Sequence, residues 1–546
     1  MALTSFSFFI FAAVVVILYF VFPKGKQWWV LLAGSLFFYL MTGWNNIFYI
    51  LITAVSSYAA ARIIENISGR KDLEKSIRKR RKLMILIATL VLNFGLLCTF
   101  KYLNFFIEQI NSIICLLKGI DLSAATALAQ TAGLGGAATS AAADPAVLTS
   151  LTSQAGLLNP VSLIIPLGIS FYTFQTMGYL IDVYWGKISA QRNFCRLLLF
   201  VSFFPQITQG PISEYRQLNS QLFEPHKFSY DRFAWGIQRF LWGFLKKAVC
   251  ADVASHCVRV IFTQYDLYCG VTVLIGAFIY SIQIYADFSG YMDMMCGLCE
   301  IMGIELAENF DRPYFSRSIA EYWRRWHITL GNWFKTYIYY PIAMSKRSRK
   351  LAKAVKNKAG KRVGDAVPAT IALIVTWFVT GLWHGATWGY IVWGLLNGFF
   401  LILQVWLDPF YALCRRKLHI KEEAWWWKIF TILRTFVLIT FIKVLPEVGT
   451  LKDGLKLWRT IFLNHVWPDR FEAWFPYNGD MINLTFMAAM IILIFIADLL
   501  RCKKPVREYF NKMPMVVRIL LLALAFVVAV GFGIRTDSGD FMYANF

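Results

Sequence analysis

The stretch Phe6–Phe22, FSFFIFAAVVVILYFVF, contains no charged residue. Similar apolar runs recur along the 546 residues. A helix of about 20 residues crosses a bilayer core of roughly 30 Å. Lipid cannot satisfy exposed backbone polar groups, so such runs are expected to be helical. The chain is therefore predicted to be an all-α polytopic membrane protein.

The candidate spans share an apolar composition and a length suited to crossing a membrane. They are 6–23, 28–44, 46–63, 83–108, 160–184, 234–262, 269–288, 368–384, 388–407, 429–446, 482–500 and 515–534. The first span lacks a basic leading region and a small-residue cleavage site, so it is interpreted as retained. Two shorter apolar pieces lie at 195–207 and 313–344. The second is rich in Trp, Tyr and Arg and is predicted to be re-entrant or interfacial.

Composition agrees with this class of protein. Hydrophobic residues make up 58% of the chain and charged residues 16%, and the mean hydropathy is +0.52. The net charge of +23 does not indicate nucleic-acid binding, because the basic residues lie in short loops between apolar runs. The ten cysteines form no disulfide framework, and the lone Cys296-x-x-Cys299 pair is not interpreted as a metal or redox site.

The basic loops also predict an orientation. If Lys24 and Lys26 are cytoplasmic, alternation of the spans places the other basic loops on the same side, with one ambiguous stretch between 195 and 345. These loops are 64–82, 185–194, 345–364, 408–428 and 501–513. Both termini are then external.

Four regions are distinguished along the chain. Residues 1–117 are N-terminal transmembrane helices, and 118–159 are a low-complexity external insertion rich in Ala, Gly, Ser and Thr. Residues 160–407 form the core that carries the unusual motifs. Residues 408–546 add C-terminal transmembrane helices and an external tail.

Two histidine motifs stand out within this hydrophobic chain. They are YWRRWHITL at 322–330, containing His327, and GLWHGATW at 381–388, containing His384. An ionisable group at membrane depth is a functional-site hypothesis, and a neutral imidazole can remove a proton from a hydroxyl. Gly385 is expected to let the backbone turn sharply and expose the His384 ring. The alternative is a histidine that only caps a carbonyl group. Neither motif has the spacing of a metal site, so no metal is predicted.

Two further motifs combine proline with polar side chains. PLGISFYTFQ at 166–175 is predicted to form a kinked helix that faces a cavity. FFPQITQGPI at 203–212 contains Gln209 between two prolines, which excludes a long straight helix.

A buried carboxylate is also expected. Asp287 lies at the end of a predicted span, within YADFSGYMDM. A charge there needs a partner, and Arg312, Arg324 and Arg325 are the candidates considered.

Six motifs between Pro166 and about Asn397 resemble, in their order, those of the membrane-bound O-acyltransferase (MBOAT) superfamily. They are PLGISFYTFQ, FFPQITQGPI, YADFSGYMDM, ENFDRPYFS, YWRRWHITLGNWF and GLWHGATW. The resemblance is to its bacterial polysaccharide-modifying branch. It implies a ring of about 11–14 transmembrane and re-entrant helices around a thinned central funnel. A cytosolic donor would reach the chemistry from one side and an external acceptor from the other.

The resemblance also implies residue roles. His384 corresponds to the catalytic histidine and His327 to the second motif histidine. The end of the chain, FMYANF at 541–546, is similar to the FxYxxF tail of this branch, in which Tyr543 would carry or hand over the acyl group. The alternative for Tyr543 is an aromatic interfacial anchor. The residues expected to bind substrate are Trp383, Trp326, Asn332, Arg324, Gln209 and Asp287.

The function implied is acyl transfer, with acetyl as the expected group, from a cytosolic thioester to a cell-envelope polysaccharide hydroxyl. The donor would be acetyl-CoA or an acyl-carrier thioester, with no bound cofactor. The expected partners are the lipid bilayer and an external SGNH-like transferase, in a bacterial plasma membrane. D-alanyl transfer from a carrier protein to teichoic acid is the alternative within this class. Outside it stand a transporter or flippase of a lipid-linked acceptor and a non-catalytic scaffold.

Overall fold

A computed structural model describes residues 4–118, 158–464, 481–501 and 506–535. Within these ranges the regular elements are all helices, as predicted, and the only β-type pairing is one isolated bridge. Seven of the helices are long and apolar enough to cross a membrane, and α1 and α2 are shorter apolar helices. The seven are α3, α4, α13, α18, α19, α23 and α25.

The helices of the first half are bounded as follows: α1 (Phe6–Val21), α2 (Gln27–Leu40), α3 (Asn46–Gly69), α4 (Lys75–Lys118), α7 (Ile169–Trp185), α8 (Phe194–Ser202), α9 (Phe204–Ile207), α10 (Tyr215–Phe223), α11 (Tyr230–Leu245), the π-helical η1 (Lys246–Ala251), α12 (Asp252–Thr263), η2 (Tyr265–Leu267) and α13 (Gly270–Ile301).

Those of the second half are η3 (Pro313–Phe315), α14 (Ile319–Arg325), α15 (Ile328–Phe334), the π-helical η4 (Lys335–Tyr339), α16 (Tyr340–Ala343), α17 (Lys346–Ala359), α18 (Lys361–His384), α19 (Trp388–Lys417), α20 (Trp425–Val444), α21 (Leu451–Leu463), α23 (Met481–Leu500), α24 (Val506–Asn511) and α25 (Met515–Arg535).

Two predicted elements differ from the sequence-based expectation. The helix expected from residue 160 begins only at Ile169, because Gly168 adopts a left-handed conformation (φ 70°) in front of it. Pro166 and Gly168 therefore precede α7 and do not kink it. The span expected at 234–262 is interrupted by the π-helical turn η1.

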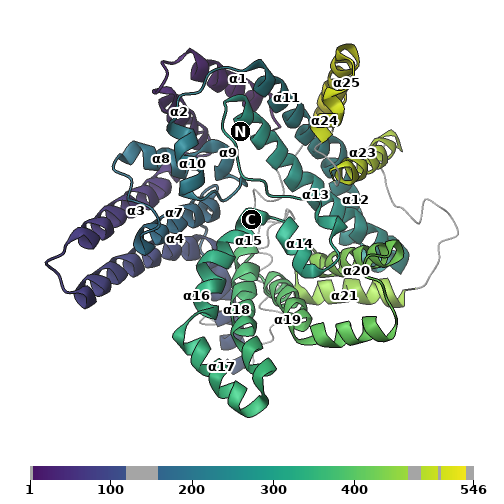
Figure 1. Ribbon diagram of the computed structural model, residues 1–546. Helices are drawn as coiled ribbons and strands as arrows, with labels where there is room; N and C mark the ends of the chain where they lie inside the picture. The colour runs from purple at the N-terminus through teal and green to yellow at the C-terminus, as the bar shows by residue number, and fades with distance from the viewer. Residues whose placement is uncertain (1–3, 119–157, 465–480, 502–505, 536–546) are drawn as a thin grey trace.

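The two motifs that were not expected to be straight helices are indeed broken. Residues 203–212 form only the four-residue α9 and then an irregular segment. Residues 313–344 divide into the short elements η3, α14, α15, η4 and α16. These short elements lie among the longer helices, and α14 and α15 are near the centre of the view in Figure 1.

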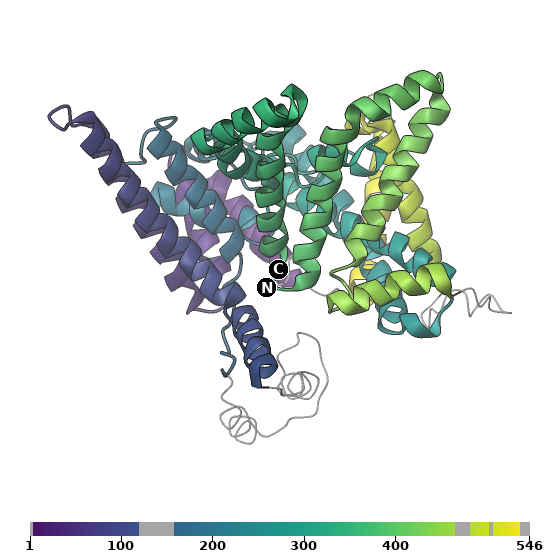
Figure 2. The same ribbon diagram turned by 90° about the horizontal axis from the view of Figure 1, so that it is seen from below.

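The long helices run broadly along one direction (Figure 2). The basic helix α17 and the connections α3–α4 and α19–α20 lie at the same end, at the top of that view. Helix α21 lies at the opposite end. The end of the molecule that carries α17 therefore forms a strongly basic surface.

Candidate functional site

The turn that carries His327 is held by a short backbone pairing with the segment after α13. Asp311 N–H donates to the Arg325 carbonyl at 3.0 Å, and Ile328 N–H donates to the Asn309 carbonyl at 3.1 Å. These two bonds flank His327 on either side in the sequence. The ENFDRPYFS motif therefore fixes where the histidine turn lies.

Asn309 also holds the first turn of α15. Its side-chain Oδ1 accepts from Thr329 N–H at 3.0 Å and from Thr329 Oγ1 at 2.7 Å. Thr329 Oγ1 in turn accepts from Ile212 N–H at 3.0 Å. His327 itself has φ 46°, the left-handed region that a non-glycine residue rarely adopts. Such strain persists only where the surroundings enforce it, and it gathers at functional sites.

His384 is the last residue of α18, and close packing against α19 places it. A Cβ on Gly381 would lie 2.5 Å from the Tyr390 carbonyl oxygen, and one on Gly394 would lie 2.8 Å from Gly381 Cα. The two helices therefore approach at glycine-only distances.

The expected role of Gly385 was wrong in its detail. Gly385 has φ −170°, which is ordinary extended backbone, and His384 is only 4% exposed. The glycine is needed for another reason: a Cβ there would overlap the ring of Tyr390, which stacks over His384 at 6.3 Å. The motif thus encloses the histidine and does not expose it.

The structure brings the two motif histidines against one tryptophan, although 57 residues separate them in sequence (384 − 327). The centroid of the Trp383 ring lies 4.8 Å from that of His384 and 6.2 Å from that of His327. Phe288 of α13 and Trp393 of α19 close the two ends, each 4.8 Å from its histidine. Both imidazoles are thus buried in an aromatic enclosure.

Two uncharged groups of this enclosure can take part in chemistry, the His327 ring and the Trp383 N–H group. Burial lowers the pKa of His327, which lies outside the seven crossing helices, to about 3, so its ring is uncharged at physiological pH. The Nε1–H of Trp383 is buried and has no hydrogen-bond partner among the described residues. Within the same residues no three His, Cys, Asp or Glu side chains gather as metal ligands.

Asp287 is buried at 1% exposure, and its partner is a lysine. Lys247 Nζ lies 2.8 Å from Asp287 Oδ1 and 2.7 Å from Asp252 Oδ1. Lys247 belongs to η1, so the π-helical turn supplies the charge that α13 requires. The substrate contact predicted for Asp287 is not visible in this ion-paired arrangement.

The arginines considered as partners of Asp287 lie elsewhere. Arg312 pairs with Asp311 at 2.9 Å, and Arg325 pairs with Glu321 at 2.7 Å. Arg324 is exposed. The prediction of an arginine partner for Asp287 was therefore wrong, because the lysine that neutralises it is 40 residues away in sequence (287 − 247).

Trp326 is buried at 2% exposure and packs against a cation. Lys443 Nζ lies 3.7 Å from the centroid of the Trp326 ring, a short cation–π distance. The same ammonium donates to Tyr314 Oη at 3.0 Å. This contact holds Trp326, the residue directly before His327, in place.

Gln209 follows α9 and is fully buried. Neither atom of its side-chain amide has a hydrogen-bond partner in the part of the chain that the structure describes. An unsatisfied buried amide costs about 1–3 kcal/mol. A ligand can therefore supply the hydrogen bonds that the Gln209 side-chain amide lacks.

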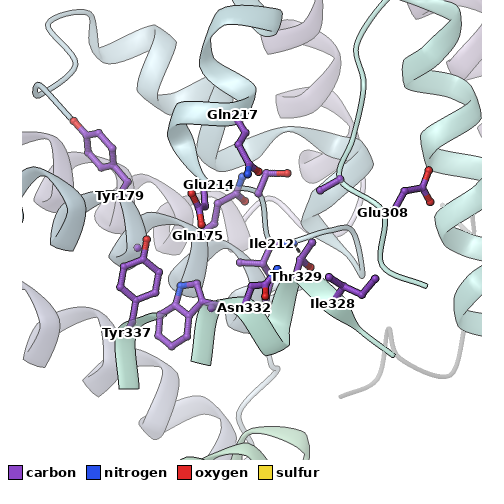
Figure 3. Close-up of a pocket in the computed structure, with 14 residues that line it drawn as sticks. Gln175, Tyr179, Ile212, Glu214, Gln217, Glu308, Ile328, Thr329, Asn332 and Tyr337 are labelled. Carbon is purple, nitrogen blue, oxygen red and sulfur yellow. Dashed lines mark hydrogen bonds between the residues drawn. The ribbon is translucent and has the colours of Figure 1, made fainter. Parts of the chain in front are cut away.

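Asn332 lines a cavity of about 100 Å³ (Figure 3). Its polar lining includes Gln175, Glu214, Gln217, Thr329, Asn332 and Tyr337. Ile328 and Thr329, which directly follow His327, also border it. The cavity therefore adjoins the histidine turn, between α7, α10 and α15.

Tyr543 lies outside the described residues. Two lysines in apolar helices, the half-buried Lys101 and the buried Lys443, were missed by the sequence analysis. The sequence did contain a signal for both lysines, because an ionisable residue within an apolar run indicates a paired or functional position. Their partners, Trp383 and Trp326, are far away in sequence and become visible only in the fold.

Comparison with known proteins identifies the family of the chain. Residues 187–356 match the MBOAT, membrane-bound O-acyltransferase family. The chain is 32% identical over 400 residues to the probable alginate O-acetylase AlgI of Azotobacter vinelandii, covering 72% of this chain and 67% of the relative. The match to the corresponding relative of Pseudomonas aeruginosa covers 64% of that relative, and the matches to three other Pseudomonas relatives cover about half of their length.

Two other relatives carry different names. A peptidoglycan O-acetyltransferase of Helicobacter pylori is 27% identical, over 96% of this chain and 92% of the relative. A teichoic acid D-alanyltransferase of Streptococcus thermophilus is 28% identical, over 50% of this chain and 67% of the relative.

The seven long apolar helices define a multi-pass membrane protein. The chain belongs to the membrane-bound O-acyltransferase family and is an acyltransferase. The family match includes His327 and ends before His384.

Proposed function

We propose that this protein transfers an acetyl group from a cytosolic thioester across the bacterial plasma membrane to a hydroxyl of a cell-envelope polysaccharide. The observation that carries the proposal is the pair of buried histidines that both pack against Trp383. The names of the alginate and peptidoglycan relatives support an O-acetyl group and a polysaccharide acceptor. Both termini are external in this proposal.

In the proposed reaction His384 is the general base. It takes the proton of an acceptor hydroxyl, the oxygen attacks the thioester carbonyl carbon, and a C–O bond forms as the C–S bond breaks. The proton then passes from His384 to the departing thiolate, which leaves as the free thiol. In this proposal the oxyanion accepts from Trp383 Nε1–H, which has no hydrogen-bond partner among the described residues. His327, which is neutral, orients the donor.

The first acceptor hydroxyl in this proposal is that of Tyr543 or of the polysaccharide itself. A Tyr543 ester would pass its acetyl group to an external SGNH-like partner transferase. The donor is acetyl-CoA. D-alanyl transfer from a carrier protein is the second candidate, favoured by the teichoic acid relative.

The test uses the purified full-length protein in lipid nanodiscs with acetyl-CoA labelled on the acetyl group. Free CoA and label on the protein are followed for wild type, His384→Ala and Tyr543→Phe. We expect His384→Ala to release no CoA, and Tyr543→Phe to retain no label. His256→Ala, which changes an exposed histidine of α12, is the matched control and keeps full activity.

Full activity in a folded His384→Ala variant would remove the proposed base. No turnover of acetyl-CoA by wild type would reject the acetyl donor and favour the D-alanyl carrier. Turnover without label on Tyr543 would leave the base intact and reject the relay.

A further inference from the structure

Two glutamines stand three residues apart in the segment 203–212, and both are buried. Gln206 is 2% exposed and Gln209 is 0% exposed. Gln206 Oε1 accepts from Gln175 Nε2 at 3.0 Å, and Gln206 Nε2 donates to Ser213 Oγ. The side-chain amide of Gln209 has no such bond on either atom within the described residues. Buried side-chain amides are normally bonded, so the contrast between the two glutamines requires an explanation.

The backbone at Gln209 is tightly folded. Gly210 N–H donates to the Gln206 carbonyl at 3.0 Å, and a Cβ on Gly210 would lie 2.2 Å from Gln206 Cα. Thr208 Oγ1 shares a hydrogen bond with the Tyr291 hydroxyl. These contacts fix the backbone on both sides of Gln209 without using its side chain, so the side-chain amide is not needed to hold the turn.

The N-terminal side of this turn is tied to the helix that packs on His327. Tyr291, the partner of Thr208, lies three residues after Phe288 on α13, and residues with this spacing share one face of a helix. The centroid of the Phe288 ring lies 4.8 Å from that of His327. Thr208 is thus attached to α13 one helical turn from the contact between α13 and His327.

The C-terminal side of the turn is tied to α15. Ile212 N–H donates to Thr329 Oγ1 at 3.0 Å, and both residues line the cavity of Figure 3. Thr329 lies two residues after His327. Because Gln209 is three residues from Ile212, their Cα atoms are at most about 11 Å apart. The unpaired amide therefore lies in a segment that both of its attachments hold next to the histidine turn and the cavity.

The chemistry of Gln209 defines the group that it can bind. Its Nε2 donates and its Oε1 accepts, so a complementary group must offer one acceptor and one donor. A secondary amide offers both, as a carbonyl oxygen and an N–H. The arm that carries the thiol in coenzyme A, and in carrier-bound thioesters, contains two secondary amides.

We infer that the Gln209 side chain recognises a secondary amide in the arm of the thioester donor and is a specificity-determining residue for acyl transfer. The inference rests on the thioester donor of the proposed function and adds recognition of its arm. A thioester without the amide leaves the buried Gln209 amide unpaired, so such a site discriminates against it.

Two substitutions with opposite expected signs test the protein without a thioester. Gln209→Met keeps the size of the side chain and removes an unpaired buried amide, so the unfolding temperature should rise. Gln206→Met is the matched control, because it breaks the hydrogen bonds to Gln175 and Ser213, and the unfolding temperature should fall. A fall in Gln209→Met equal to that in Gln206→Met would show that the Gln209 amide is already paired and would overturn the inference.

Recognition of the arm is measured by competition with acetyl-CoA, using the full-length protein in nanodiscs. One competitor is S-acetyl-N-acetylcysteamine, which has one secondary amide, and the other is S-pentyl thioacetate, which has the same chain length without it. The free concentration of each that halves CoA release is compared between wild type and Gln209→Met. We expect the variant to need about tenfold more of the amide competitor and an unchanged amount of the other. The KM for acetyl-CoA should rise, with little change in kcat.

An equal change for both competitors would assign Gln209 a structural role and overturn the inference. Gln209→Leu is measured beside Gln209→Met, and a folded sample of either gives the result. If neither is folded, wild type decides, because equal inhibition by the two competitors would show that no amide is recognised. No turnover of acetyl-CoA by wild type would overturn the proposed donor and this inference with it, whereas turnover with an equal change for both competitors would overturn only the role of Gln209.

Discussion

At the scale of single residues, His327 combines a buried ring with a left-handed backbone (φ 46°). That conformation costs an ordinary residue about 1–2 kcal/mol and costs glycine little. We expect His327→Gly and His327→Ala both to lose acyl transfer. The glycine variant should be the more stable of the two by roughly 1 kcal/mol. Thermal unfolding of the purified variants in one detergent measures the difference.

His384 provides the control for this prediction, because it ends a helix with ordinary geometry. At that position the order should reverse, since glycine in a helix is less stable than alanine by up to about 1 kcal/mol. If His327→Ala were more stable than His327→Gly, the backbone strain inferred at residue 327 would be absent from the protein.

At the scale of elements, the α18–α19 hairpin sets the position of His384 through Gly381. A methyl group there would meet the Tyr390 carbonyl oxygen at 2.5 Å. We expect Gly381→Ala to separate the helices, to destabilise the protein by about 1–3 kcal/mol, and to lower kcat at least tenfold. Unfolding temperature and thioester turnover measure the two effects.

Gly95→Ala in α4 is the matched control, because no atom lies within 4 Å of its added methyl group. It should preserve activity and slightly raise stability. If Gly381→Ala kept the turnover of wild type, the position of His384 would not depend on the close approach of α18 and α19 at Gly381.

The π-helical element η1 supports a different prediction. Lys247 bridges Asp287 and Asp252, and both it and Asp287 are buried. Lys247→Met leaves two carboxylates without their cation, so we expect a loss of about 3–5 kcal/mol. Adding Asp287→Asn should restore part of it. The unfolding temperatures of the single and double variants measure the coupling, and additive effects would contradict the ion-pair interpretation.

Most helices were predictable from the sequence because their signal is local. Runs of apolar residues gave α3, α4, α13, α18 and α19 their approximate positions. The start of α7 was not predictable from hydrophobicity, because it depends on the left-handed Gly168, whose Cβ would overlap the Ile207 carbonyl.

The site was only partly predictable for a related reason. The histidine motifs were visible by their composition, and the structure does bring His327 and His384 together around Trp383. The partners of Asp287 and Trp326 were not visible, because Lys247 and Lys443 lie in other helices. Ion pairing and cation–π contacts depend on which helices become neighbours, and no short window of sequence contains that information.

At the scale of the whole molecule, the enclosure around the histidines lies among helices whose basic ends gather at one surface (Figure 2). Helix α17 alone contributes seven Lys and Arg residues, KRSRKLAKAVKNKA, and no acidic residue. Such a surface attracts anions over a Debye length of about 10 Å. An anionic thioester donor is the substrate that this charge would concentrate, provided that the basic surface is cytoplasmic.

That orientation is the last prediction. The positive-inside bias places the basic end of the molecule in the cytoplasm. Single cysteines at the exposed positions Asp72, Lys353 and Lys421 should therefore resist a membrane-impermeant maleimide in intact cells and react after permeabilisation. A cysteine at the exposed Lys452 of α21, at the opposite end, should react in intact cells. The ten native cysteines are replaced beforehand to remove background labelling. Labelling of position 353 from outside would invert the proposed orientation, and labelling of 353 and 452 from the same side would contradict the helix arrangement itself.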